Sequence, residues 1–152
     1  MAITNRETLR DKLKDLFAAA LVGTNKPMQA FYEYMKGDFG GQSPVGCISS
    51  GGSMRTQEAI NTREMNVFYF EVYSFTLYVD QAAPTAWDEQ KAEDRVDLIE
   101  KTIADVLVTN RTLSGFWETI GFENRSKIDF VIVGGEEYKR ETFYLKAVCR
   151  DN

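Results

Sequence analysis

The pattern of apolar and polar residues at the start of the chain predicts an amphipathic helix from about Thr4 to Val22. Thr4 and Glu7 fit a capping box, in which each side chain satisfies an unpaired backbone donor at the start of the helix. One face carries apolar residues at helical spacing, and these residues are Leu9, Leu13, Leu16, Phe17, Ala20 and Leu21. Gly23 and Pro27 are then expected to end the helix.

Three apolar runs after this helix predict strands, and they extend from Ala30 to Met35, from Pro44 to Ser49 and from Asn66 to Val79. The third run is the longest and changes parity, because Phe68, Phe70 and Val72 mark one face whereas Phe75, Leu77 and Val79 mark the other. Side chains along a strand alternate strictly between two faces, so this change predicts a β-bulge or a strong bend near Tyr73 and Ser74.

Two polar segments between these strands predict loops. Residues 50–65 form the longer one, which opens with Gly51 and Gly52. A loop of that length inside a compact domain is usually functional or disordered. The shorter loop runs from Lys36 to Ser43 and contains three glycines.

The second half of the chain predicts one helix and three more strands. The helix runs from about Ala86 to Val108, and its expected buried stripe comprises Val96, Ile99, Ile103, Val106 and Leu107. The strands extend from Phe116 to Phe122, from Lys127 to Val133 and from Glu141 to Cys149. Gly134 and Gly135 predict a tight turn between the last two strands.

The predicted order of elements is therefore α-β-β-β-α-β-β-β within a single domain spanning residues 1–152. Two helices and one mostly antiparallel, strongly bent sheet predict an α+β fold, a two-layer α/β sandwich with both helices packed on the sheet. Hydrophobic residues make up 43% of the sequence and charged residues 27%, which is the balance of a globular domain.

Candidate chemistry is sparse. The sequence contains no histidine, the commonest general base and metal ligand. Glu136 and Glu137 lie in the predicted hairpin turn without the ligand spacing of a calcium loop. The segment Ser50 to Ser53 lacks the lysine that follows the glycines of a P-loop. We therefore predict no catalytic, metal or cofactor site, and a protein that is not an enzyme.

Net charge, the two cysteines and the N-terminal sequence limit the partners and the cellular location that we expect for the protein. Net charge is −5 with basic residues scattered among acids, which argues against tight binding to nucleic acid. Cys47 and Cys149 lie in apolar strand-like runs and are interpreted as small buried hydrophobic residues, although a disulfide between them stays open. The chain starts without the pattern of a signal peptide, and no apolar run reaches the ~18 residues of a membrane span, so we expect cytosolic synthesis without membrane association.

Four stretches of the chain, in their order and spacing, carry a family resemblance. The first stretch is the helix Arg6–Leu21, and the second is the glycine-bearing segment Ser43–Arg55. The third is the long strand that ends at Asp80, together with the helix after it that contains Asp97, Glu100 and Ile103. The fourth is Leu113–Phe116, together with the closing segment Phe143–Ala147. Together they cover most of the chain. In this arrangement the sequence resembles the tail terminator, or tail completion, family of long-tailed phages.

The resemblance implies a structural virion protein that forms a ring, typically a hexamer. Such a ring caps the tail tube, ends tube polymerisation and provides the surface for head–tail joining. The implied partners are the tail tube protein and the head–tail connector or neck proteins, and the implied location is the virion tail, assembled in the cytoplasm of the host bacterium. DNA would pass through the channel without tight binding, because six copies would carry a net charge of about −30.

We interpret residues 50–65 as a partner-contacting loop within this ring. Its candidate contacts are Ser53, Met54, Arg55 and Arg63. The Lys36–Ser43 loop is a second candidate, with Asp38 and Phe39 as its contacts.

Two other functions fit the sequence. A neck or head-closure connector protein would share the size and the partners but would bind on the portal side. A small-ligand-binding α+β domain would instead use the many aromatic residues to line a pocket, whereas aromatic stripes at strand spacing are more often core. The oligomeric state in solution separates the ring-forming protein from the ligand-binding domain.

Overall fold

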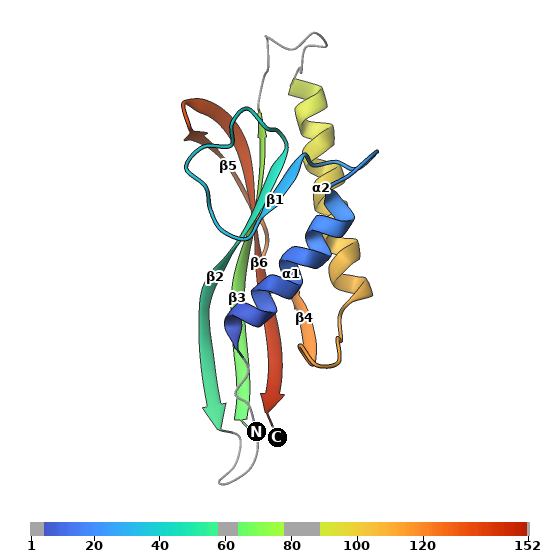
Figure 1. Ribbon diagram of the computed structural model, residues 1–152, viewed down its shortest axis with the longest axis vertical. Coiled ribbons are helices and arrows are strands. Elements are labelled where there is room, and N and C mark those ends of the chain that lie inside the picture. The colour runs from blue at the N-terminus through green and yellow to red at the C-terminus, as the bar shows by residue number, and fades with distance from the viewer. Residues whose placement is uncertain (1–4, 58–63, 78–88, 152) are drawn as a thin grey trace.

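The computed structural model of the protein describes residues 5–57, 64–77 and 89–151 (Figure 1). Its elements are α1 (Arg6–Leu21), β1 (Ala30–Tyr32), β2 (Val45–Gln57), β3 (Glu64–Leu77), α2 (Glu89–Thr109), β4 (Thr119–Phe122), β5 (Lys127–Val133) and β6 (Glu136–Asp151). The predicted order of elements and the α+β class are confirmed. The predicted strand end at Val79 and the predicted helix start at Ala86 lie outside the described residues.

The strands form one curled sheet with the hydrogen-bonded order β1-β2-β3-β6-β4, and β5 also pairs with β6. β1 is parallel to β2, and the other pairs are antiparallel. β5 pairs with residues 136–142 of β6 and β4 with residues 145–148, so these two short strands follow one another along the same edge of β6. Figure 1 shows the β5–β6 hairpin curling over at one end of the sheet.

Both helices pack on one face of the sheet and form the larger core. α1 contributes Leu9, Leu13, Phe17 and Leu21, and α2 contributes Ile99, Ile103 and Leu107. The buried stripe predicted for the second helix is confirmed, except that Val106 is only partly buried. The N-cap of α1 is Asn5, whose Oδ1 accepts a hydrogen bond from the Glu7 amide at 2.8 Å. The helix begins at Arg6, so its N-cap is Asn5 rather than the predicted Thr4, which lies outside the described residues.

A second, smaller core lies on the opposite face and explains the parity change in β3. Phe70 and Val72 point into the helix-covered core, whereas Phe75 points into the second core. The residues of the second core are Phe39, Val45, Cys47, Phe75, Val133 and Tyr138. The prediction near Tyr73 and Ser74 was a β-bulge or a strong bend. β3 pairs with β6 in unbroken register, so the bulge is wrong. Apolar residues of both parities are buried because both faces of the sheet are covered.

The register does shift in β2, between Ser50 and Gly52. Beyond this bulge β2 stays paired with β3 as far as Gln57 opposite Glu64. The prediction of a loop over residues 50–65 is therefore wrong for both flanks, because the β3 ladder satisfies the backbone groups that a polar, glycine-rich sequence would otherwise leave to water. Within the predicted loop, residues 58–63 lie outside the described residues.

Three other boundaries differ from the prediction. β1 ends at Tyr32 rather than Met35, β4 begins only at Thr119, and β6 begins directly after the turn at Glu136. Gly134 and Gly135 form the predicted turn with φ values of +58° and +82°. Positive φ at both central residues is the geometry of a type I′ hairpin turn, which glycine adopts without steric cost.

Cys47 and Cys149 are both free and buried. Cys47 belongs to the second core and Cys149 to the helix-covered core, so the sheet separates them. Burial raises the pKa of the Cys47 thiol to about 11, which keeps it protonated and unreactive at neutral pH. The interpretation of both cysteines as buried hydrophobic residues is confirmed. Neither helix, over its described residues, is long and apolar enough to span a membrane.

Candidate interaction surface

The described residues that were predicted to contact partners fall in two different places. Ser53, Met54 and Arg55 lie on β2 rather than on a loop, and all three are exposed. Arg63 lies outside the described residues. Asp38 and Phe39 lie in the segment between β1 and β2 and are considered separately below.

The outer part of β2 forms an open edge of the sheet. β1 covers β2 only from Val45 to Cys47, so the stretch Ser50–Gln57 has a strand partner on one side alone within the described residues. A strand edge of this kind presents backbone donors and acceptors that can pair with another chain.

The N-terminal end of α1 lies against this edge and supplies positive charge. The Arg6 guanidinium donates to the Ser53 hydroxyl at 3.1 Å, and the Arg10 guanidinium donates to the Ser50 hydroxyl at 3.0 Å. Arg55 lies over the Phe68 ring, 5.2 Å from its centroid. We call the surface formed by Arg6, Arg10, Ser50, Ser53 and Arg55 the α1–β2 corner. It is a polar surface with three guanidinium groups.

Asp38 and Phe39 do not behave alike. Phe39 is only 3% exposed, and its ring packs against those of Phe75 and Tyr138. Its predicted contact with a partner is therefore wrong, because the side chain is a core residue. Asp38 is exposed, accepts a hydrogen bond from the Gly40 amide at 2.8 Å, and lies beside Gly134 in the β5–β6 turn.

The strongest apolar feature on the described surface is one face of β5. Ile128, Phe130 and Ile132 are 48%, 52% and 73% exposed. We call these three residues the β5 stripe. They lie opposite Glu141, Lys139 and Glu137 of β6, on the face of the sheet that the helices cover elsewhere.

The other face of β5 holds the strand in place. Val131 and Val133 pack in the second core. Asp129 accepts two hydrogen bonds from the Arg140 guanidinium, at 2.9 Å and 2.6 Å, and this partner lowers the pKa of Asp129. A bidentate pair of this kind is geometrically specific, so the β5 stripe is displayed by a fixed strand rather than by a loose end.

Acidic residues border the β5 stripe. Glu93, Asp97 and Glu100 are exposed on α2 and lie near Lys139 and Glu141 of β6; we call them the acidic rim. Glu93 forms an ion pair with Lys139. Glu141 lies on β6 beneath the rim and is 4% exposed. Burial raises the pKa of the Glu141 carboxyl, and the nearby negative charges of Glu100 and Asp97 raise this pKa further. The hydrogen bond that Ser126 donates to Glu141 partly opposes the increase.

Replacing Glu141 with glutamine is expected to stabilise the protein at neutral pH. A raised pKa means that the folded state favours the protonated carboxyl over the ionised one. The Glu141 side chain therefore destabilises the fold increasingly as the pH rises above 4.5, the ordinary pKa of a glutamate. Glu141→Gln should therefore raise the free energy of unfolding at pH 7 by about 1 kcal/mol. Urea denaturation at pH 7 and pH 4.5 measures this, with exposed Glu137→Gln as the matched control. A gain of equal size at both pH values would contradict the explanation.

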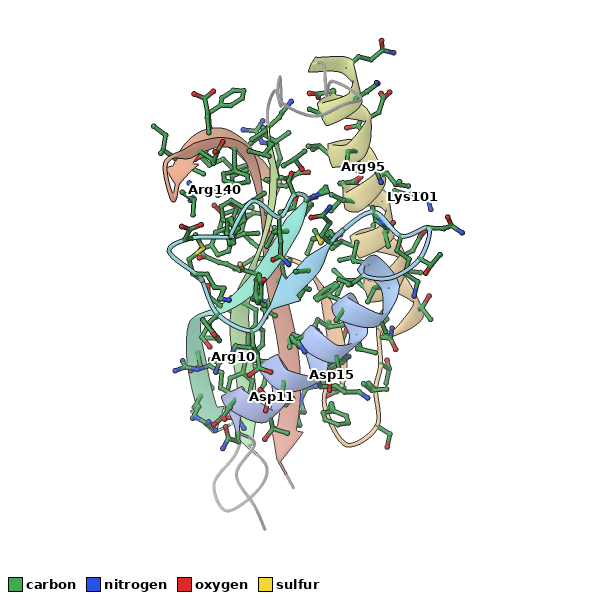
Figure 2. The ribbon with its side chains drawn as sticks, turned by 45° about the horizontal axis from the view of Figure 1, so that its top comes forward. Arg10, Asp11, Asp15, Arg95, Lys101 and Arg140 are labelled. Atoms are coloured by element: carbon green, nitrogen blue, oxygen red, sulfur yellow. The ribbon has the colours of Figure 1, made fainter. Side chains whose placement is uncertain are left out.

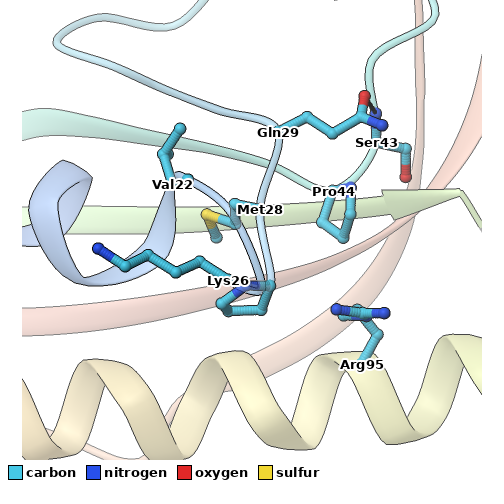
Figure 3. Close-up of a pocket in the computed structure, with 9 residues that line it drawn as sticks. Val22, Lys26, Met28, Gln29, Ser43, Pro44 and Arg95 are labelled. Carbon is cyan, nitrogen blue, oxygen red and sulfur yellow. Dashed lines mark hydrogen bonds between the residues drawn. The ribbon is translucent and has the colours of Figure 1, made fainter.

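A hollow of about 460 Å³ lies between α2 and the segments that flank β1 (Figure 3). Its described lining is Val22, Gly23, Lys26, Pro27, Met28, Gln29, Ser43, Pro44 and Arg95. The Lys26 ammonium donates to the Ala19 carbonyl, and the Ser43 hydroxyl accepts from the Leu77 amide at 2.9 Å. No carboxylate lies among these residues, so the described lining offers no base that would activate the serine.

Within residues 5–57, 64–77 and 89–151, no group of three cysteine, aspartate or glutamate side chains is arranged to hold a metal ion. Glu136 and Glu137 are both exposed in the turn region. The chain matches no known protein-family model, and a comparison with curated proteins finds no significant relative. Function is therefore inferred from the surfaces described above and from the resemblance in the sequence.

Proposed function

We propose that this protein is a structural subunit that assembles with copies of itself into a ring. The observation that carries the proposal is the β5 stripe, three large apolar side chains exposed side by side on a strand at the edge of the sheet. Exposed apolar surface that is grouped in this way usually marks an interface. The α1–β2 corner gives the same chain a second, chemically different surface at another edge of the sheet.

Two different surfaces on one subunit suit a head-to-tail interface, which closes into a ring when the rotation between neighbours allows it. The resemblance to tail terminator proteins specifies the ring further as a hexamer that caps the tail tube of a long-tailed phage and ends its polymerisation. In that role the exposed loops and strand ends meet the tube protein on one side and the head–tail connector proteins on the other. The proposal includes no catalytic step.

Deleting the protein during phage assembly is expected to leave overlong tails without heads, because nothing would stop tube growth or provide the joining surface. Electron microscopy of the particles measures tail length and head attachment, and resupply of the intact chain is the control. Normal virions would reject the role. Tails of normal length without heads would instead favour a neck or head-closure protein.

Self-assembly can be measured without the phage. Light scattering after size-exclusion chromatography is expected to show a mass that rises with concentration toward six chains. A chain that stays monomeric at every concentration, and also in the presence of tail tubes, would contradict the ring proposal.

A further inference from the structure

We infer that the β5 stripe is the docking site for the α1–β2 corner of a second copy of this chain. The inference rests on the proposed function and names the two surfaces that its ring would join. It commits to a pairing in which the Ser50–Gln57 edge of one copy lies along the β5 edge of its neighbour, so that the sheet continues from copy to copy.

The shape of the β5 stripe suits an extended partner. Its residues share one face at every second position, so three side chains span about 13 Å at the ~3.3 Å rise per residue of a strand. A row of alternate side chains beside an open strand edge is the pattern used in strand addition, where main-chain hydrogen bonds hold the partner and alternate side chains fix its position. The Ser50–Gln57 stretch is an extended segment that, among the described residues, pairs with a strand on one side alone.

Charge selects the α1–β2 corner as the surface that meets the stripe. The acidic rim consists of Glu93, Asp97 and Glu100, all exposed beside β6. The corner presents Arg6 and Arg10 at the end of α1, hydrogen-bonded to hydroxyls of β2. When the corner of a second copy lies on the β5 stripe, its α1 end covers the apolar side chains and brings these guanidinium groups to the rim. Potentials of opposite sign then face each other across the contact.

The same charges disfavour the simplest alternative, a two-fold dimer through two β5 strands. That arrangement would bring no guanidinium group of the corner to either acidic rim, so it would lack the charge complementarity of the proposed contact. The two surfaces also lie at opposite ends of the molecule. In Figure 2, Arg10 lies at the α1 end beside β2, whereas Arg140 marks the curl of the β5–β6 hairpin. Each copy therefore uses one surface to receive a neighbour and the other to dock on the next.

Cysteine cross-linking between copies tests the pairing. A chain carrying Ile132→Cys is mixed with a chain carrying Ser53→Cys under mild oxidation. A disulfide needs Cα atoms within about 7 Å of each other, and the native Cys47 and Cys149 are buried. We expect the yield of the mixed disulfide dimer to be about ten times the yield of the disulfide dimer that either chain forms alone. Val108→Cys replaces Ile132→Cys in the control, since Val108 is 63% exposed on α2. Equal yields with the control, or a majority of Ile132→Cys homodimers, would overturn the inference.

Substitutions at the same sites test its energetics. Ile132→Asp is expected to weaken self-association at least ~10-fold, whereas Val108→Asp leaves it unchanged, because a charge on the stripe would be buried in the contact. Arg6→Glu should weaken association as well, and Glu100→Arg in the same chain should restore it. If the unmodified chain assembles and Ile132→Asp assembles equally well, the ring stands and this docking site is rejected. If the unmodified chain never assembles, the proposed function itself fails.

Discussion

Replacing Phe75 with alanine is expected to lower the free energy of unfolding by about 3–5 kcal/mol, the usual cost of emptying a buried phenylalanine site. Phe75 is 0% exposed at the centre of the second core. Its ring centroid lies 4.9 Å from that of Phe39 and 6.2 Å from that of Tyr138. The three rings come from three separate parts of the chain, so a cavity there removes contacts that no neighbour can replace by a small shift.

The consequence of this substitution should extend to the β5 stripe. Tyr138 and Val133 attach the β5–β6 hairpin to the second core, and loss of the Phe75 ring loosens that attachment. Self-association should therefore weaken together with stability. Urea denaturation measures the stability, and light scattering measures the assembly.

Phe122→Ala is the matched control for Phe75→Ala, because Phe122 is 43% exposed on β4 and its replacement leaves no closed cavity. The control should cost less than Phe75→Ala, about 1 kcal/mol, because Phe122 is half-exposed and contacts the Phe143 ring from the rim of the core. Equal losses for the two variants would mean that the second core contributes no more than the surface does. Loss of assembly in the control alone would show that β4, rather than the β5–β6 hairpin, governs the contact between copies.

The elements that sequence alone predicted are those whose signals are local. α1 and α2 repeat their apolar residues at helical spacing, and that repeat specifies a buried face without reference to the rest of the chain. The Gly134–Gly135 turn is equally local, since two adjacent positions with positive φ favour glycine, asparagine or aspartate. These predictions hold because each depends only on residues that are close together in the sequence.

The errors concern features that distant residues decide. Residues 50–57 have the composition of a loop, and they form a strand only because β3 offers a ladder on which they can pair. Phe39 lies in a glycine-rich segment whose local pattern indicates a loop, yet the ring is buried by Phe75 and Tyr138 from elsewhere in the chain. Tertiary contacts override local preference in both cases.

The candidate interaction surface was predicted only in part. Ser53, Met54 and Arg55 are exposed as the partner-contact interpretation required, although they lie on a strand edge rather than on a loop. The β5 stripe was missed, because alternation along β5 indicates a strand but not which face is covered. Ile128, Phe130 and Ile132 have the composition of a core face, and only the positions of α2 and the second core reveal that Val131 and Val133 are the inward residues.

Replacing Gly46 with alanine is expected to lower the free energy of unfolding by about 1–3 kcal/mol, the usual cost of overpacking a core. A Cβ atom on Gly46 would lie 2.4 Å from Cδ2 of Phe31 and 2.9 Å from Sδ of Met28. The Phe31 ring cannot retreat easily, because it is only 6% exposed and packs 5.7 Å from the ring of Phe17. The parallel pairing of β1 with β2 sets Phe31 opposite Gly46, so the substitution should displace β1.

Gly121→Ala provides the opposite result on the same sheet. Gly121 lies on β4, and an added Cβ there would meet nothing within 4 Å. Alanine should stabilise the strand by about 0.5–1 kcal/mol, since glycine loses more backbone freedom on folding. Urea denaturation of both variants under one buffer condition compares them directly. If Gly46→Ala proved as stable as Gly121→Ala, β1 would have to separate from β2 without cost, and the parallel strand would contribute nothing to the fold. A loss in Gly46→Ala alone ties the requirement for glycine to the Phe31 ring rather than to strand backbone in general.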